Sequence, residues 1–189
     1  MPQNDNTGEV CRAAYFANAS EPAVIFKHGT VRFNAVCLKT FPSADYILFI
    51  VYKYDKKLSI KPGGSDVFNA VRWSSLNPEK RKPKCITGQE FYSRVIELMQ
   101  WDKKCNYKLF GKAARDDDGI FISFDLNSAL IYRPDEYGRM SRMPEYPEEW
   151  GDGFGVSMEQ HKSNPLFRRF DADTEINIEQ EKQLEEIEE

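Results

Sequence analysis

The longest continuous apolar stretch in this chain covers residues 46–52, and it has only seven residues. A membrane-spanning helix needs roughly 20 apolar residues, so this stretch does not predict one. The aromatic and β-branched side chains from Tyr46 to Tyr54 predict a β-strand over these residues that is buried on both faces. Asp55, Lys56 and Lys57 then predict a tight turn, and residues 58–61 alternate like the partner strand of a hairpin.

Two short predicted strands and a helix precede this hairpin. The strands cover residues 23–26 and 30–33, and the helix covers residues 35–41. Asn34 is suited to cap this helix, because its side-chain oxygen can accept a hydrogen bond from a backbone N–H of the first turn. Pro42 ends the helix, because proline supplies no N–H to continue it. The predicted order is therefore strand, helix, hairpin.

The same order is predicted again later in the chain. An amphipathic helix is expected over residues 89–101, where the apolar residues Phe91, Val95, Leu98 and Met99 recur at helical spacing. Strands are predicted over residues 106–110, 120–126 and 129–132. Residues 111–115 are read as a connection that leads into an acidic turn at residues 116–118. We therefore expect an α+β fold in which two βαββ-type units form a small β-barrel-like core, since one hairpin alone is only marginally stable.

Changes in composition divide the chain into six segments. They are an N-terminal arm (1–22), a first βαββ unit (23–64), a basic linker (65–85), a second βαββ unit (86–133), an irregular aromatic extension (134–170) and an acidic tail (171–189). In the linker, Val67, Phe68, Val71 and Trp73 are predicted apolar anchors. The tail has nine Asp and Glu residues and one Lys, which predicts a solvated helix or a disordered segment.

The net charge of −4 hides a strong asymmetry along the chain. Residues 1–114 contain 18 Lys and Arg against 10 Asp and Glu, whereas residues 115–189 contain 8 against 20. This distribution indicates a polyanion-binding body with an acidic tail. The candidate phosphate contacts are Lys53, Lys56, Lys57, Lys61, Arg72, Lys80, Arg81, Lys82 and Lys84.

Cations of this kind gain affinity for DNA mainly by releasing counterions, which predicts salt-sensitive and weakly specific binding. The tail is then expected to compete with DNA for the basic face, or to recruit a basic partner. The alternative interpretation is that these lysines only keep the hairpin and the linker in solution.

Catalytic and metal-binding patterns are scarce. Cys11, Cys37, Cys85 and Cys105 form no C-x-x-C pair, and the chain has only two histidines. The three aspartates at residues 116–118 are interpreted as a solvated turn. The glycine-rich segments lack the Lys-Ser/Thr ending of a phosphate-binding loop. We therefore expect a non-enzymatic protein with no catalytic residues, metal or cofactor.

A second functional hypothesis is a protein-interaction module, with or without a second copy of the chain. Its candidate partner-binding residues are Tyr146, Trp150 and Phe154, which lie among acidic residues, glycine and proline. An enzyme would instead need a deep pocket that gathers His28 or His161 with a cysteine or a carboxylate. The chain does not open with a basic start followed by an apolar run, so we expect no signal peptide, no membrane partner and a cytoplasmic location with reduced thiols.

The predicted order of strand, helix and hairpin resembles the unit of AbrB/SpoVT-type swapped-hairpin transcription regulators, and a second unit in one chain is similar to the arrangement in MraZ. Several short segments also resemble a family of small uncharacterised proteins from integrative and conjugative elements of anaerobic Gram-positive bacteria, some of which carry the label integrase. These segments are Tyr46-Ile-Leu-Phe-Ile-Val, Leu58-Ser-Ile-Lys-Pro62, Ile86-Thr-Gly88, Glu97-Leu-Met-Gln-Trp101, Asn106-Tyr-Lys108, Phe124-Asp-Leu126, and Tyr146-Pro-Glu-Glu-Trp150 with Phe154-Gly155. The resemblance implies a DNA-associated role on a mobile element. It supplies no catalytic residues, and neither histidine is followed at the third position by the arginine of a tyrosine recombinase.

Overall fold

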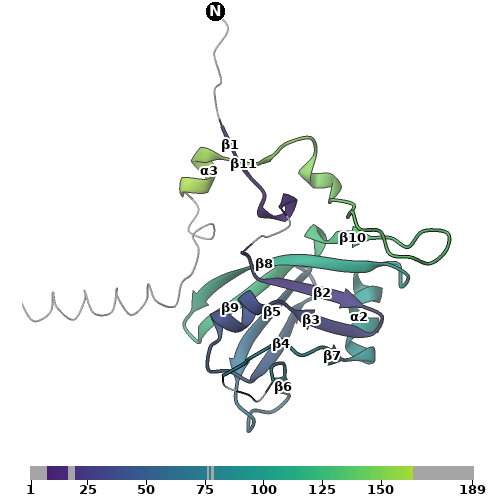
Figure 1. The fold of residues 1–189 in the computed structure, drawn as a ribbon. Coiled ribbons are helices and arrows are strands. Elements are labelled where there is room, and N and C mark those ends of the chain that lie inside the picture. The colour runs from purple at the N-terminus through teal and green to yellow at the C-terminus, as the bar shows by residue number, and fades with distance from the viewer. Residues whose placement is uncertain (1–7, 17–19, 76, 78, 164–189) are drawn as a thin grey trace, which may run out of the picture.

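The computed structural model describes residues 8–16, 20–75, 77 and 79–163. A nearly closed antiparallel sheet forms the body, and a small two-stranded ribbon lies above it (Figure 1). Helices and strands are both present, and the sheet dominates. The expected α+β class with a barrel-like core is therefore confirmed at this level of detail.

Nine strands of the described residues belong to the main sheet. They are β2 (Ala23–Lys27), β3 (Thr30–Phe33), β4 (Tyr46–Tyr52), β5 (Lys57–Gly63), β6 (Val71–Arg72), β7 (Ile86–Thr87), β8 (Asn106–Asp116), β9 (Gly119–Asp125) and β10 (Leu130–Tyr132). Their spatial order is β6-β4-β5-β9-β8-β2-β3-β7, and β10 pairs with β8 beside this path. The long strand β8 joins the two sides of the sheet, because its first half pairs with β2 and its second half pairs with β9.

Each of the two longer hairpins follows a helix. Helix α1 (Ala35–Thr40) precedes β4 and β5, and helix α2 (Gln89–Met99) precedes β8 and β9. Strand β3 pairs with β7, and β5 pairs with β9, both in antiparallel register. The strand that precedes α1 therefore pairs with the strand that precedes α2, and the second strands of the two hairpins also pair with each other.

Asn34 begins helix α1 as its sequence position predicts. Its Oδ1 accepts a hydrogen bond from the Cys37 N–H at 3.2 Å, and another from the Ala23 N–H at 3.1 Å. Its Nδ2 donates to the Glu21 carbonyl at 2.8 Å. One side chain thus caps the helix and fastens it to the start of β2.

Aromatic side chains dominate the core. The Phe33 ring lies 5.7 Å from Phe49, 5.6 Å from Trp73 and 6.0 Å from Phe124, measured between centroids. Phe49 also contacts Phe91 of α2 at 5.2 Å, so this helix packs against the sheet. Such edge-on and tilted pairs are favourable beyond the area that they bury.

Two predictions for the strands are wrong. Residues 46–52 are not buried on both faces: Ile47 alone is buried in β4, and Tyr52 is exposed. The reason is that successive side chains face opposite sides of the sheet: Ile47, Phe49 and Val51 face the core, whereas Leu48 and Ile50 lie on the other face, where neither is buried. Residues 111–115 are not a connection, because β8 continues through them and pairs with β9 up to Asp116.

The apolar anchors predicted in the linker behave differently from one another. Trp73 is confirmed as a core residue with 1% exposure, and Val71 is half-buried in β6. Val67 and Phe68 are exposed, Phe68 to 87%, so the prediction is wrong for these two. They lie in the turn between β5 and β6, where the two strands bend away from the core.

The N-terminal arm is tied to the aromatic extension. Strand β1 (Glu9–Cys11) pairs with β11 (Gly155–Ser157), and helix α3 (Met158–Ser163) follows directly. Three 3₁₀ helices complete the described structure: η1 (Ala13–Tyr15), η2 (Leu126–Ser128) and η3 (Glu148–Trp150). Residues 9–11 of the predicted arm therefore belong to a β-ribbon. The predicted acidic tail lies outside the described residues.

Within the described part of the chain, no helix combines the length and the apolar character needed to cross a membrane.

Candidate functional site

The nine predicted cationic contacts do not form one continuous face. Lys53, Lys56 and Lys57 lie at the turn of the β4–β5 hairpin, where Tyr52 pairs with Lys57. Arg72 lies at the opposite end, because it pairs with Tyr46 at the start of β4. A seven-residue strand is roughly 20 Å long, so two separate groups of cations result.

Two of the hairpin lysines are held by internal partners. The Lys61 Nζ donates to the Asp116 Oδ2 at 2.7 Å and lies 3.6 Å from the Asp118 Oδ2. The hydrogen bond with Asp116 raises the pKa of Lys61, and the same bond lowers the pKa of Asp116. The Lys56 Nζ donates to the Leu98 carbonyl at 3.0 Å, at the end of α2. These two lysines therefore help to join parts of the fold.

Arg81 points inward and anchors its loop. Its guanidinium donates to the carboxylate of Asp45 at 3.2 Å, and to a group of backbone carbonyls. Those carbonyls belong to Phe41, Pro42 and Ala44. The side chain is 17% exposed. Arg81 therefore has a structural role in the fold, since both terminal amino groups of its guanidinium already donate hydrogen bonds within the protein.

The rest of the loop is held in an extended form against residues 73–75. The Lys84 N–H donates to the Trp73 carbonyl at 2.8 Å. The Ser75 N–H donates to the Lys82 carbonyl at 3.2 Å, and the Lys82 N–H donates to the Ser75 Oγ at 3.1 Å. Ser74 is also bridged to Pro83. Extended backbone alternates the direction of its side chains, so Lys82 and Lys84 share one side, and Lys80 precedes them at a bend where its N–H donates to the Asn77 carbonyl at 3.2 Å.

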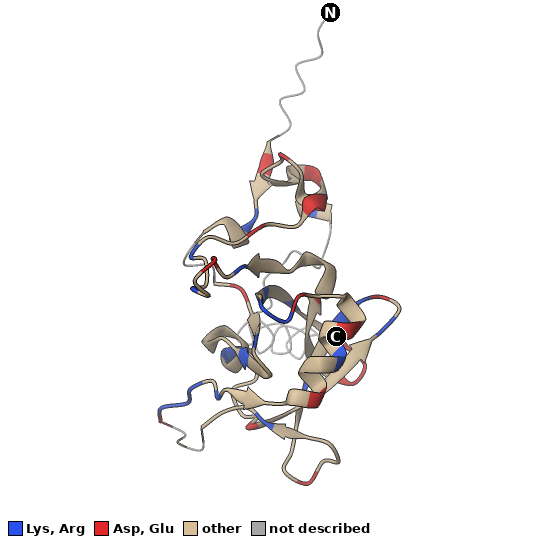
Figure 2. Cartoon of the chain, turned by 90° about the vertical axis from the view of Figure 1, so that its right-hand side faces the viewer, with Lys and Arg blue, Asp and Glu red and all other residues tan. Residues whose placement is uncertain are grey.

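The exposure of the side chains alternates along this segment, with half-buried residues between exposed lysines. Lys80, Lys82 and Lys84 are exposed, whereas Arg81 and Pro83 are half-buried. Successive lysines in such a segment are roughly 7 Å apart along the chain. Figure 2 shows this basic segment on the loop that projects from the lower left of the body. We call Lys80, Lys82 and Lys84 the lysine ridge.

Several hydrogen bonds hold the base of the ridge in place. The Trp73 Nε1 donates to the Ala44 carbonyl at 2.8 Å, and the Ser74 Oγ donates to the Asp45 carboxylate at 2.7 Å. Arg72 belongs to this base as well, since its Nε donates to the Ser74 carbonyl at 3.3 Å. Preorganised cations lose less conformational entropy when they meet a polyanion.

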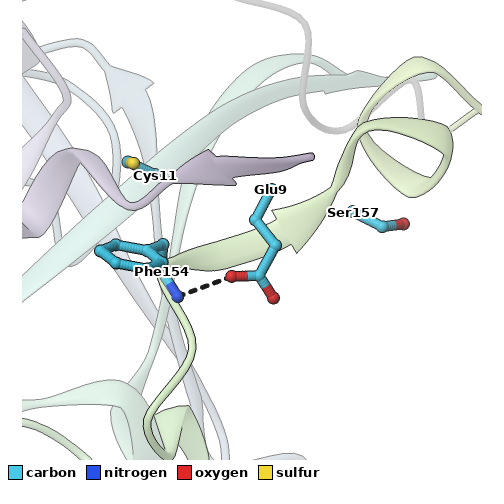
Figure 3. Close-up of a pocket in the computed structure, with 4 residues that line it drawn as sticks. All are labelled: Glu9, Cys11, Phe154 and Ser157. Carbon is cyan, nitrogen blue, oxygen red and sulfur yellow. Dashed lines mark hydrogen bonds between the residues drawn. The ribbon is translucent and has the colours of Figure 1, made fainter. Parts of the chain in front are cut away.

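The three predicted partner-binding aromatics are in different environments. Tyr146 and Trp150 pack around Tyr15, at centroid distances of 5.0 and 5.8 Å, and the Arg12 guanidinium lies 4.6 Å from the centre of the Trp150 ring. These contacts attach the extension to the N-terminal arm. Phe154 is 66% exposed. Figure 3 shows it beside Cys11, Glu9 and Ser157 at a shallow pocket, where its N–H donates to the Glu9 carboxylate at 2.8 Å.

Sequence reasoning missed a larger groove of about 1020 Å³. Its walls come from the β1–β11 ribbon and α1, and its floor includes Phe110 and Lys112 of β8. These two side chains alternate with buried Leu109 and Gly111, so they face outward. A strand prediction extended past residue 110 could have found these two side chains, because residues 110 and 112 point to the same face of a strand.

The described residues contain no group of three or more His, Cys, Asp and Glu side chains that could hold a metal ion. Cys37 and Cys105 are buried, and burial raises the pKa of the Cys37 thiol to about 12. His28 lies at the β2–β3 turn, whereas His161 lines the groove.

No family model matches the chain, and the searches of curated proteins and of solved structures also found no match.

Proposed function

We propose that this protein is a non-enzymatic DNA-binding regulator or accessory protein of a mobile genetic element, and that the lysine ridge contacts DNA phosphates. The observation that carries this proposal is the alternation of exposed Lys80, Lys82 and Lys84 with the anchored Arg81 and Pro83. Three exposed ammonium groups on one short segment can neutralise neighbouring phosphates and release their counterions. No side chain is assigned to base reading, so the proposed binding is weakly specific.

The arrangement of the sheet supports the regulatory part of this proposal. Two runs of strand, helix and hairpin contact each other through antiparallel β3–β7 and β5–β9 pairs. A two-fold relation between two βαββ units requires antiparallel pairing of equivalent strands. We therefore propose that the chain contains two such units, as its resemblance to AbrB/SpoVT and MraZ regulators implies.

The decisive experiment compares two variants with equal loss of charge. In the first, Lys80, Lys82 and Lys84 are all changed to Ala, and Arg81 is retained because it anchors the loop. In the control, Lys27, Lys103 and Lys104 are changed to Ala; these residues are exposed and lie at the end of β2 and in the turn before β8. Duplex DNA binding is measured over a range of salt concentrations.

The ridge variant should bind more weakly, and its slope of log affinity against log salt should fall by about 2 to 3. The control should keep the slope of the unmodified protein. Equal losses in the two variants would contradict the ridge as the DNA contact. Absence of binding by the unmodified protein would contradict the function itself.

A second candidate function is protein binding through the extension. The observation that favours it is that Phe154 is 66% exposed where it lines the shallow pocket beside the β1–β11 ribbon. The test is the mass of the protein in solution as concentration rises, for the unmodified chain and for Phe154→Ser. A dimer that Phe154→Ser abolishes would support this function. A monomeric mass for both the unmodified chain and the variant would contradict self-association.

A further inference from the structure

The groove described above carries an excess of basic side chains. Arg12, Lys39, Lys57 and Lys112 line it, against the two acidic residues Glu21 and Asp125. Lys57 was predicted as a DNA contact, but it lies in this groove and away from the lysine ridge. The groove is therefore an anion-favouring surface that is distinct from the ridge.

Lys112 lies at the centre of the groove floor. Burial lowers the pKa of its ammonium group, and Arg12 acts in the same direction, while Glu21 and Asp125 act against it. An additional carboxylate in the groove would stabilise the charged form of this lysine.

Apolar side chains lie between these charges. Phe110 and Phe121 belong to the floor, and Val36, Trp150 and Val156 belong to the walls. An occupant that matches the groove therefore needs carboxylates and aliphatic side chains together. A bare phosphate backbone would leave the apolar part of the groove uncovered.

The chain itself contains a segment with this composition. Residues 171–189 have nine Asp and Glu residues with one Lys, and four aliphatic residues are spaced among them. These are Ile176, Ile178, Leu184 and Ile187.

The segment also starts close enough to reach the groove. His161 lines the groove, and helix α3 ends two residues later at Ser163. Residues 164–170 can span roughly 25 Å when extended, which allows residue 171 to return to the groove from the end of α3.

We propose that the acidic segment 171–189 binds in this groove of its own chain. Its carboxylates meet Lys39, Lys57 and Lys112, and its aliphatic side chains meet Phe110 and Phe121. Because the segment is tethered, its effective concentration is in the millimolar range, and individually weak contacts are enough. This placement differs from the predicted competition for the whole set of nine cations, of which Lys57 alone lines the groove. It also does not depend on DNA binding.

A thiol on the groove floor can report whether the groove is occupied. Ser123 lines the groove and pairs with Lys112 across β8 and β9. The test uses Ser123→Cys together with Cys11→Ser, since Cys11 is the exposed thiol of the ribbon. Cys85 is exposed beside Lys84 and serves as the internal reference for the ridge. Alkylation rates of both thiols are measured in the full chain and in a chain that ends at Ser163.

Truncation should raise the alkylation rate at position 123 about five-fold or more and leave the rate at Cys85 unchanged. A synthetic peptide of residues 171–189 should restore the protection at position 123, and salt should weaken its effect. In the full chain, Lys39→Gln with Lys57→Gln should also raise the rate, whereas the control Lys103→Gln with Lys104→Gln should not.

Equal rates at position 123 in the full and truncated chains would overturn the proposal. Faster alkylation of Cys85 on truncation would overturn it as well, because it would place the segment on the lysine ridge. Slow alkylation of buried Cys37 and Cys105 in every variant verifies that the fold is retained. None of these measurements contains DNA, so their outcome is separate from the test of the DNA-binding function.

Discussion

The guanidinium of Arg81 lies 3.2 Å from the carboxylate of Asp45, although the two residues are 36 positions apart in the sequence. The same guanidinium also donates to carbonyls in the turn between α1 and β4. One charged side chain thus fastens the basic loop to the end of a helix. The neighbouring lysines are left to face solvent as a result.

Arg81→Ala should lower the free energy of unfolding by about 2 kcal/mol, because several charge-assisted hydrogen bonds are lost together. Arg81→Lys should recover less than half of this loss, since a lysine cannot reproduce the planar fork. Urea denaturation provides the measurement. A loss below about 0.5 kcal/mol for Arg81→Ala would contradict the anchoring role.

Two aromatic residues of the linker should respond very differently to substitution. Trp73→Ala should cost about 3 to 5 kcal/mol, because Trp73 is fully buried among Phe33 and Phe41. Phe68→Ala should change stability by less than about 0.5 kcal/mol, because its ring is in solvent. Thermal or urea unfolding of the two variants side by side provides the comparison. A similar cost for both would show that Phe68 is buried in solution.

Gly111 should not tolerate a side chain. A Cβ at this position would lie 2.5 Å from the Phe124 Cε1 and 2.9 Å from the Ile122 Cγ2, and both residues are fully buried. Gly111→Ala should therefore destabilise the protein by about 1 to 3 kcal/mol through overpacking.

The control for this change is Gly88→Ala, where a Cβ would be 3.8 Å from the nearest atom, the Phe91 Cβ. Its effect should stay below about 1 kcal/mol. Phe124→Leu should partly rescue Gly111→Ala, because the smaller side chain makes room. Equal stability of the two glycine variants would contradict the close packing of β8 against β9.

The pair of Lys61 and Asp116 should be visible in acid titration. The hydrogen bond from Lys61 holds the pKa of Asp116 below its ordinary value of 3.8. A depressed carboxyl pKa contributes stability above the unfolded value, and this contribution is lost as the pH falls below 3.8 through the folded value. The raised pKa of Lys61 matters at alkaline pH. Its contribution to stability is present below pH 10.5, the ordinary pKa of lysine, and is lost as the pH rises through the raised pKa.

Carbon NMR titration of the Asp116 carboxyl group measures this effect directly. Lys61→Gln should move the pKa of Asp116 upward, while Lys57→Gln on the same strand should leave it unchanged. Added salt should reduce the difference, since the pair is close to solvent. An unchanged Asp116 pKa in Lys61→Gln would contradict the ion pair.

Local patterns were enough to predict the elements that depend on near neighbours in the chain. Asn34 caps α1, the apolar spacing of Phe91 and Val95 produces α2, and the acidic residues before Gly119 form the β8–β9 turn. Each of these features is decided by contacts within a few residues, so the sequence alone determines it.

The roles of the charged residues were decided only by the tertiary structure. A count of charges treats Arg81 and Lys82 as equivalent. In the structure, Arg81 donates hydrogen bonds to carbonyls some 40 positions away in the sequence, whereas Lys82 is exposed. Lys61 finds its partner 55 positions later in the chain. A long, flexible cation interacts with whatever the fold places within reach, and no local pattern encodes those distant groups. The groove has the same origin, because its walls come from opposite ends of the chain that meet only when β1 pairs with β11.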